Sequence, residues 1–464
     1  MKLRHLIYPL AAAILTGLAV TSCVYDEAAE PDTPAPVTPE QPADSEPETA
    51  TITLSLTAAP MGTSSRAEGD QFTDGEKAED AAQANELINN WFVAFVREGK
   101  VYATATGQPE AAWNDRVSLE LPRGTYSAIA FANIPEADIP QEFKADATLP
   151  ADWKEKIYTA AAPASTAGIP MSGYLENFQV RGTVNEIFAI EVVRMFSKVQ
   201  FTFKNRCQTD AVKINSIDFT PVYTGNIFMF RNNGDKPTPD SNPENEPALP
   251  AHGSDTYATV NHLVNQDLTS SVVNSQVKPL RTHFYIKESI AAGNHATDHF
   301  HIGVNLQREG RAAETVTALA DEKLEFFYRN DYVLFPIVIS DYTPELEVFD
   351  YPPIGGYPVQ VDNKGTEFYA TFSSSGAFDI LAHLRDSQGR TIVVKPQSQG
   401  GTSENYVEEP VIVNAPEKFT LTFDPMENKW RGDFPQGSTE TITITFKFHI
   451  ESLVYTRTLY LLSK

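Results

Sequence analysis

The chain has few cysteines, which limits how it can be stabilised. Only Cys23 and Cys207 occur among its 464 residues. If Cys23 is modified, no intramolecular disulfide can form, and stability must come from burying apolar side chains. We expect Cys207 to be one such small buried residue.

Motifs of common enzyme and metal sites are missing as well. There is no G-x-S-x-G, no H-E-x-x-H, no P-loop and no glycine-rich dinucleotide fingerprint. The nearest approach to a metal site is His295, Asp298, His299 and His301, which has no visible second shell, so a solvated hairpin is the preferred interpretation. We therefore predict no enzyme activity, no metal and no cofactor.

Basic residues are fewer than acidic ones, and they do not cluster along the sequence. The chain has 36 Lys and Arg against 61 Asp and Glu, for a formal net charge of −25. Nucleic acids and anionic lipids both bind to positively charged surfaces, so neither is an expected partner. Such acidity favours solubility outside the cell.

One apolar run stands out, at residues 6–20. It follows the basic Lys2 and Arg4 and is too short and too early for a membrane span. It leads to Cys23 rather than to an A-x-A site, so we predict a lipoprotein signal peptide at 1–22 instead of an ordinary one. Acyl chains on Cys23 would then tether the protein to the outer membrane.

The segment after Cys23 has the composition of a spacer. Residues 24–50 contain six prolines, eight acidic residues and no basic one, so they cannot bury a core. We predict a disordered tether over 23–50. Asp26 and Glu27 resemble the surface-export signal of lipoproteins from the Bacteroides group.

The rest of the chain alternates apolar and polar residues with the period of β-strands. In 51–57, Ile52, Leu54 and Leu56 share one face. Short strands separated by turns predict an all-β fold of two tandem β-sandwich domains, 51–195 and 196–464. The other expected strands are 90–97, 100–106, 116–121, 125–133, 178–193, 198–203, 212–220, 281–288, 299–307, 313–320, 323–329, 331–340, 367–373, 376–384, 410–413, 418–423, 440–450 and 453–462.

A few stretches break this pattern. Residues 231–255 are rich in Pro, Asn and Asp and predict an exposed loop, while 134–165 predicts loop with a short helix around Trp153. Only 76–90 has helical spacing. The Gly-Asp pair of Arg431-Gly-Asp433 is interpreted as a turn between two strands.

Several local patterns together resemble the fimbrillins of Bacteroidales, the subunits of the type V pilus. In the first half these are Leu121-Pro-Arg-Gly-Thr-Tyr-Ser-Ala-Ile-Ala-Phe-Ala-Asn133, Ile169-Pro-Met-Ser-Gly173 and Val193-Arg-Met-Phe-Ser-Lys-Val199. In the second half, Tyr328-Arg-Asn-Asp-Tyr332 resembles the family's Arg-Asn-x-x-Tyr element. With the lipoprotein start, the resemblance spans nearly the whole chain and implies transthyretin-like sandwiches.

The resemblance also implies a way of working. Such subunits reach the cell surface as lipoproteins, and a trypsin-like protease cuts them after an arginine beyond the first strand. Here the cut would fall between Arg66 and Ala67, in a small, polar stretch that a protease can reach. The strand 51–57 would then leave, and a strand of another fimbrial subunit would fill the groove. Adhesion to a host or bacterial surface ligand is the implied role.

The last segment is a second candidate for exchange. Leu453, Tyr455, Leu459 and Leu461 lie on one side of a strand near Lys464. This strand could be donated to a neighbour, or it could be the last core strand of the second sandwich, in which case the protein would occupy the fimbrial tip.

Two other functions stay open. One is a glycan-binding surface lipoprotein that does not polymerise, which would use an exposed aromatic platform drawn from Trp91, Trp113, Trp153 and Trp430. The other is a fimbrial anchor that keeps both its first strand and its lipid.

Overall fold

The structure is a computed structural model of the whole chain. All described residues belong to the second of its two compact units, 47–464. The residues described are 49–65, 83–108, 116–159, 168–182, 186–208, 211–230, 247, 249–250, 257–271, 278–291, 299–318, 324–351, 357–402, 405–416, 419–435 and 441–464. Cys23, Arg66, Ala67, Trp113, His295 and Asp298 lie outside them.

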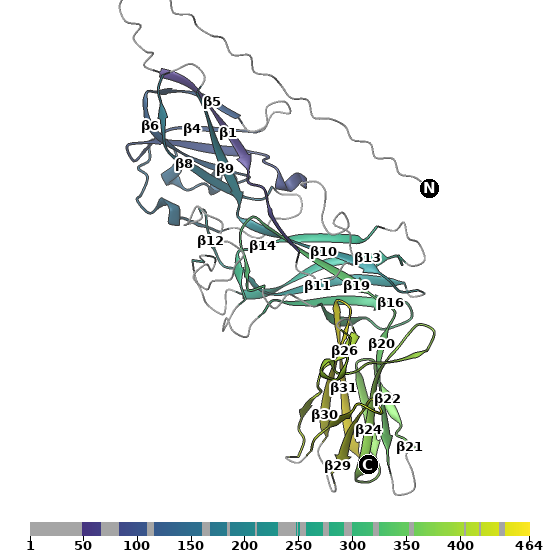
Figure 1. The fold of residues 1–464 in the computed structure, drawn as a ribbon. Helices are drawn as coiled ribbons and strands as arrows, with labels where there is room; N and C mark the ends of the chain where they lie inside the picture. Colours follow the sequence, from purple (N-terminus) through teal and green to yellow (C-terminus); the bar gives the residue numbers. More distant parts are fainter. Residues whose placement is uncertain are drawn as a thin grey trace, which may run out of the picture. The chain divides into compact units, whose positions relative to one another are not determined.

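The predicted all-β class is confirmed, since strands and short 3-10 helices are the only regular elements that the described residues form (Figure 1). The strands are β1 Thr49–Ala58, β2 Gly62–Ser65, β3 Trp91–Arg97, β4 Lys100–Gly107, β5 Arg116–Pro122, β6 Gly124–Ala132, β7 Ile157–Tyr158, β8 Met171–Val180, β9 Glu186–Arg194, β10 Phe196–Asn205, β11 Val212–Tyr223, β12 Ile227–Phe228, β13 Tyr257–Leu268, β14 Leu280–Lys287, β15 Ser289–Ile290, β16 His301–Arg308, β17 Glu314–Ala318, β18 Phe326–Phe327, β19 Asp331–Ile339, β20 Thr343–Asp350, β21 Tyr357–Pro358, β22 Val361–Asn363, β23 Glu367–Phe372, β24 Gly376–Arg385, β25 Thr391–Val393, β26 Asn405–Val407, β27 Val411–Val413, β28 Thr422–Asp424, β29 Lys429–Phe434, β30 Ile442–Ile450 and β31 Leu453–Ser463.

The first sheet contains seven strands in the order β4-β3-β6-β8-β9-β1-β5. Strands β8 and β9 pair at only two positions, and residues of β1 and β9 share one buried cluster with residues of β3, β6 and β8. The sheet therefore folds over at β8 and β9 into two packed layers. The β3–β4 hairpin turns at Glu98 and Gly99, with φ of 54° and 73°.

Side chains on the two faces of β3 and β6 belong to two different buried clusters. Val93 and Phe95 face the cluster shared with β1, whereas the intervening Phe92 packs in a second cluster with Trp153 and Phe230. The segment 134–158 thus covers the second face of these strands. The short helix expected around Trp153 is present as the 3-10 helix Trp153–Glu155.

The second half contains three larger sheets. One has the order β14-β10-β19-β2, one runs β13-β11-β16-β17-β31-β23-β22 with β30 joined to β31, and one runs β21-β20-β24-β29-β28. A continuous buried cluster extends from Val199 to Leu461 and includes Cys207, which is buried as expected. The division into two domains at residue 196 stays a prediction.

Several expectations about individual elements were wrong. The expected strand 178–193 is two strands, β8 and β9, and 323–329 contains only the two-residue β18. Strands β2, β13 and β20 were missed. The helix expected at 76–90 is not present in its described part, where only Ala84–Glu86 forms a 3-10 helix.

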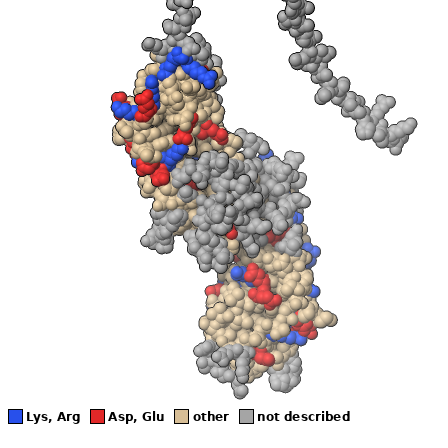
Figure 2. All heavy atoms as spheres, turned by 60° about the vertical axis from the view of Figure 1, so that its left-hand side comes forward, with Lys and Arg blue, Asp and Glu red and all other residues tan. Residues whose placement is uncertain are grey.

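The described residues also bear on the membrane and on charged partners. None of their helices is long and apolar enough to cross a bilayer. On the face drawn in Figure 2, Lys and Arg side chains form a short band at the upper end of the molecule, and elsewhere acidic and basic side chains lie in small groups.

Candidate strand-exchange site

Strand β1 is an internal strand of the first sheet. It pairs antiparallel with β5 and parallel with β9, through seven residue pairs on each side. The apolar residues Ile52, Leu54 and Leu56 are fully buried, while Thr51 and Thr57 are exposed. The alternation read from the sequence thus places the three aliphatic side chains in the core between the two layers.

The chain continues from β1 into a different sheet. After the connector Ala59–Met61, β2 pairs in parallel with β19 at the edge of the sheet β14-β10-β19-β2. The segment 49–65 is therefore internal to one sheet and an edge of another. Ser65, the last residue of β2, immediately precedes Arg66.

Two buried polar side chains hold the connector by its backbone. Arg194 Nη1 donates to the carbonyl oxygen of Ala59 at 2.7 Å and to Asn330 Oδ1 at 2.9 Å. Asn330 Nδ2 donates to the carbonyl oxygen of Pro60 at 2.8 Å. The Ala59 amide in turn donates to the Val192 carbonyl at 2.9 Å. We call Arg194 and Asn330 the connector clasp.

The arginine of the clasp is fixed from its other side. Its Nε and Nη2 donate to the Glu86 carbonyl oxygen at 3.2 and 2.8 Å, and only 5% of Arg194 is exposed. Burial lowers the pKa of the Arg194 guanidinium, yet an arginine titrates so far above neutrality that it stays charged. The site therefore contains a buried positive charge aimed at backbone carbonyls.

The carboxylate of Glu86 anchors the same region. Glu86 Oε1 lies 2.7 Å from Lys198 Nζ, with both side chains 2% exposed, and accepts a hydrogen bond from the Tyr285 hydroxyl at 2.9 Å. Its Oε2 accepts from the Gln83 amide at 2.9 Å. Such a satisfied network is costly to disrupt, because removing one partner leaves a buried charge unpaired.

The fold brings together motif residues that are far apart in the sequence. Strands β10 and β19 pair in parallel with Lys198 opposite Tyr332, which places Arg194 beside Asn330, 136 residues away. Asn330 has a φ of 63°, a left-handed conformation that asparagine tolerates well. The two stretches Val193–Val199 and Tyr328–Tyr332 therefore meet at the connector.

The stretch Ile169–Gly173 reaches the same place. A Cβ on Gly173 would lie 2.3 Å from the Glu191 carbonyl oxygen, so only glycine allows β8 to approach β9 this closely. A cavity of about 430 Å³ opens beside the connector, and its walls include Ala59, Pro60, Gly173, Tyr174 and Asn330.

The candidate donor strand β31 is also internal. It pairs antiparallel with β30 over nine residue pairs and parallel with β23. Leu453, Tyr455, Leu459 and Leu461 are all at most 2% exposed. The Tyr455 hydroxyl accepts a hydrogen bond from Arg308 Nη2 at 3.1 Å. In this structure β31 is thus a core strand, the second of the two interpretations left open by the sequence.

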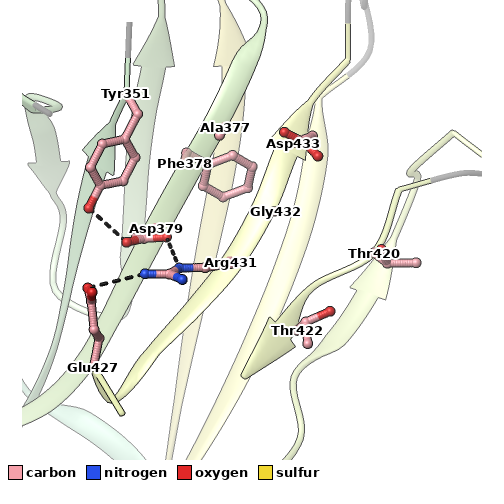
Figure 3. A pocket seen from close by; sticks show the side chains of 10 residues that line it. All are labelled: Tyr351, Ala377, Phe378, Asp379, Thr420, Thr422, Glu427, Arg431, Gly432 and Asp433. Carbon is pink, nitrogen blue, oxygen red and sulfur yellow. Dashed lines mark hydrogen bonds and ion pairs between the residues drawn. The ribbon is translucent and has the colours of Figure 1, made fainter. Parts of the chain in front are cut away.

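The Arg-Gly-Asp tripeptide does not form a turn. Arg431-Gly-Asp433 lies inside β29 and pairs with β24, so the turn interpretation was wrong. Arg431 contacts Asp379 and Glu427 at 3.3 and 3.2 Å (Figure 3), and it contacts Asp424 at 2.7 Å. The Arg431 side chain, which is 48% exposed, is thus engaged by three carboxylates.

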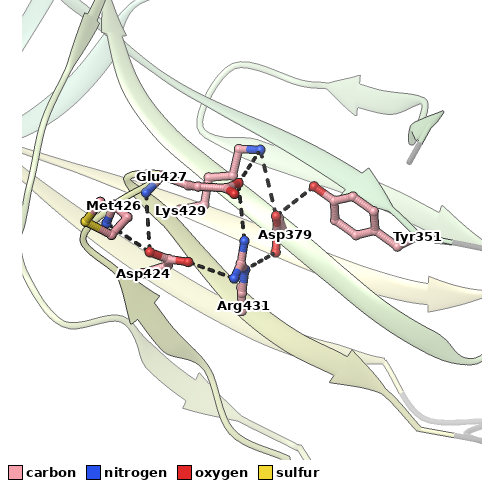
Figure 4. A network of polar contacts seen from close by, with 7 residues as sticks. All are labelled: Tyr351, Asp379, Asp424, Met426, Glu427, Lys429 and Arg431. Atoms are coloured by element: carbon pink, nitrogen blue, oxygen red, sulfur yellow. Dashed lines mark hydrogen bonds and ion pairs between the residues drawn. The ribbon is translucent and has the colours of Figure 1, made fainter. Parts of the chain in front are cut away.

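The surrounding polar residues complete a network that spans several strands (Figure 4). Asp379 is 2% exposed and accepts from the Tyr351 hydroxyl at 2.8 Å. A hydrogen bond from the Met426 amide is the main reason that the pKa of Asp424 is lowered. The cavity of about 540 Å³ beside this network is lined by polar and apolar residues. Of its charged side chains, Asp379 and Glu427 are paired with Arg431.

The tryptophans and histidines considered for other functions differ in how exposed they are. Among the described tryptophans, Trp153 and Trp430 are buried and Trp91 is half-buried, so none forms an exposed platform. His301 is exposed and His299 half-buried.

No protein-family model and no curated protein matches the chain. Solved structures do resemble it. The tip fimbrial protein Mfa3 of Porphyromonas gingivalis is 10% identical, with 67% of this chain and 98% of that one covered and a TM-score of 0.38. A fimbrilin of the same species is 12% identical, with 89% and 98% covered and a TM-score of 0.33. A fimbrial assembly protein of Parabacteroides distasonis is 10% identical, with 74% and 98% covered and a TM-score of 0.30.

These similar structures are fimbrial proteins of Bacteroidales, the group to which the sequence motifs pointed. Identity and superposition are both low, however. The function proposed below therefore rests on contacts within this chain.

Replacing Arg194 with Ala should lower the free energy of unfolding of the full chain by about 2–5 kcal/mol, because the Ala59 and Glu86 carbonyls and Asn330 would lose a buried donor. Chemical denaturation measures the change. The matched control is Arg181→Ala, since Arg181 is exposed, and its effect should stay within about 0.5 kcal/mol. Equal effects of the two substitutions would show that the clasp contributes no special stability.

Proposed function

We propose that this chain is a subunit of a cell-surface fimbria and that segment 49–65 is a temporary occupant of the site where a strand of another subunit binds. The observation that carries the proposal is the place of β1, an internal strand whose Ile52, Leu54 and Leu56 are fully buried. Because β1 precedes every other described strand, one cut beyond β2 would separate it from the rest of the fold.

The proposed cut lies after Arg66, made by a trypsin-like protease on a lipoprotein acylated at Cys23. It would free β1 and β2 together, since β2 ends at Ser65. The edges of β5, β9 and β19 would then have unpaired backbone groups. Such edges recruit an extended strand by β-sheet addition.

Loss of the apolar contacts of β1 would make the empty groove unstable. Withdrawing Ile52, Leu54 and Leu56 forfeits on the order of 4–9 kcal/mol of apolar burial, whereas the net stability of a whole domain is only about 5–15 kcal/mol. The vacancy therefore provides the drive for assembly, and the incoming strand needs apolar side chains at every second position to replace what was lost.

The connector clasp adds a second requirement for the incoming strand. When the Ala59 and Pro60 carbonyls leave, Arg194 and Asn330 retain buried donors without acceptors, which is unfavourable. A strand that continues past β9 toward β19 would restore both hydrogen bonds through its own backbone. The clasp is thus a positioning element that sets how far the strand inserts.

The last strand has a different part in this proposal. In this proposal β31, which is hydrogen-bonded on both sides, stays in its own subunit. The chain would act as a strand acceptor, which agrees with a place at or near the fimbrial tip. Attachment to a host or bacterial surface ligand would be the role of the assembled fimbria.

Replacing Arg66 with Ala should leave the protein on the cell surface acylated at Cys23 and monomeric, since segment 49–65 would remain covalently attached. N-terminal sequencing and the size of the surface-extracted protein measure this. The matched control is Arg181→Ala, an exposed arginine between β8 and β9, which should be processed to an Ala67 start. Fimbriae of normal length from the Arg66 variant would refute the proposed processing.

Replacing Leu54 with Ala should destabilise the uncut precursor by about 2–5 kcal/mol, as for other buried leucines, and leave the assembled fimbria unaffected because the strand has departed. The matched substitution Leu459→Ala, at a fully buried residue of β31, should weaken both forms. Thermal unfolding of precursor and of purified fimbriae provides the comparison. If Leu54→Ala weakened the fimbria as much as the precursor, β1 would still be in place.

A further inference from the structure

Two carboxylates and a histidine converge on the outer face of strands β20 and β24. Glu345 lies opposite His383 in the antiparallel pair, and Glu347, two residues along, is on the same face. One carboxylate oxygen from each glutamate and one imidazole nitrogen all lie within 4.8 Å of one another. The residues that alternate with them, such as Leu346 and Leu384, face the core.

The imidazole of His383 is buried without a hydrogen bond. The residue is 0% exposed, and neither Nδ1 nor Nε2 has a hydrogen-bond partner in the described part of the chain. Buried polar atoms are nearly always hydrogen-bonded, so an unpartnered imidazole requires an explanation. Its Nε2 is directed at two carboxylate oxygens, 3.5 Å away on Glu345 and 3.6 Å away on Glu347.

These separations are too long for hydrogen bonds but suit ligands of one ion. When a tetrahedral ion binds nitrogen and oxygen at about 2.0–2.2 Å, its neighbouring ligand atoms lie roughly 3.3–3.6 Å apart. The Nε2 atom already has this spacing to each of the two oxygens. An ion could therefore bind between them with little movement of β20 or β24.

We infer that Glu345, Glu347 and His383 form a binding site for a divalent transition-metal ion, with water completing the coordination. Imidazole with carboxylates is a ligand set that suits Zn²⁺, whereas Mg²⁺ prefers six oxygen ligands in an octahedron. The two carboxylates would balance the charge of the ion. The site is independent of strand exchange, because it uses none of the residues that contact β1, β2 or the connector.

Arg385 is a built-in competitor for this site. Its Nε lies 2.6 Å from Glu345 Oε2 and its Nη2 lies 3.5 Å from Glu347 Oε1. Its side chain is 36% exposed and also donates to the Gly389 carbonyl at 3.0 Å, so it can leave the carboxylates while keeping a partner. Metal binding would exchange one cation for another on the same two carboxylates.

The test is calorimetric titration of the purified full-length chain with zinc chloride, after dialysis against a chelator. One saturable Zn²⁺ per chain is expected, and Mg²⁺ should not displace it. His383→Gln should weaken Zn²⁺ binding by at least about tenfold, since even loss of an outer-shell partner typically costs that much. Arg385→Gln should strengthen binding by removing the competing guanidinium.

The matched control is His449→Gln. His449 is also nearly buried in a sheet, but its Nε2 contacts a single carboxylate, Glu408, at 2.6 Å. This substitution should leave the Zn²⁺ affinity unchanged. Because His383 is fully buried, Glu347→Gln serves as a second variant, with a side chain that is 43% exposed in the parent and a substitution the fold should tolerate.

Absence of saturable Zn²⁺ binding by the parent chain would overturn the assignment. So would unchanged binding by folded His383→Gln or Glu347→Gln, or loss of binding in His449→Gln. Circular dichroism of each variant establishes that it is folded.

Discussion

The first half of the molecule depends on one constraint, which is that a strand must occupy the space between β5 and β9. A strand there must satisfy two rows of backbone groups and supply apolar side chains to the space between two layers. Neither requirement depends on which molecule provides the strand, since hydrogen bonding and burial are the same for any chain of that pattern. Whether β1 stays in place therefore depends on its covalent link to the rest of the chain and on competition from other strands.

The connector clasp limits this permissiveness. A guanidinium that is almost fully buried must find acceptors in fixed directions, and Arg194 finds them in the carbonyls of Ala59 and Glu86 and in Asn330. Backbone carbonyls carry no side-chain identity, so the clasp selects register rather than sequence. The apolar groove and the polar clasp thus impose different conditions on the same segment.

Much of the strand content could be predicted from the sequence, but the clasp could not. The alternation of Ile52, Leu54 and Leu56 predicted a buried strand because one face of β1 is core and the other solvent. Strand β13 was missed since most of its residues are exposed and its pattern is weak. The clasp depends on a hydrogen bond between residues 136 positions apart and on hydrogen bonds to backbone carbonyls. Such contacts leave no periodic signal in the sequence. The family-like motifs nevertheless contained both side chains.

The parallel pairing of β1 with β9 has a consequence for how the chain folds. Strand β1 is made first, but its parallel partner follows only after β3, β4, β5, β6 and β8. Contacts of such long sequence separation form late, because much of the loop-closure entropy must be lost before they are made. The edge of β1 that faces β9 therefore stays unpaired until the last strand of its sheet has been made, whereas β5 can pair with the other edge earlier.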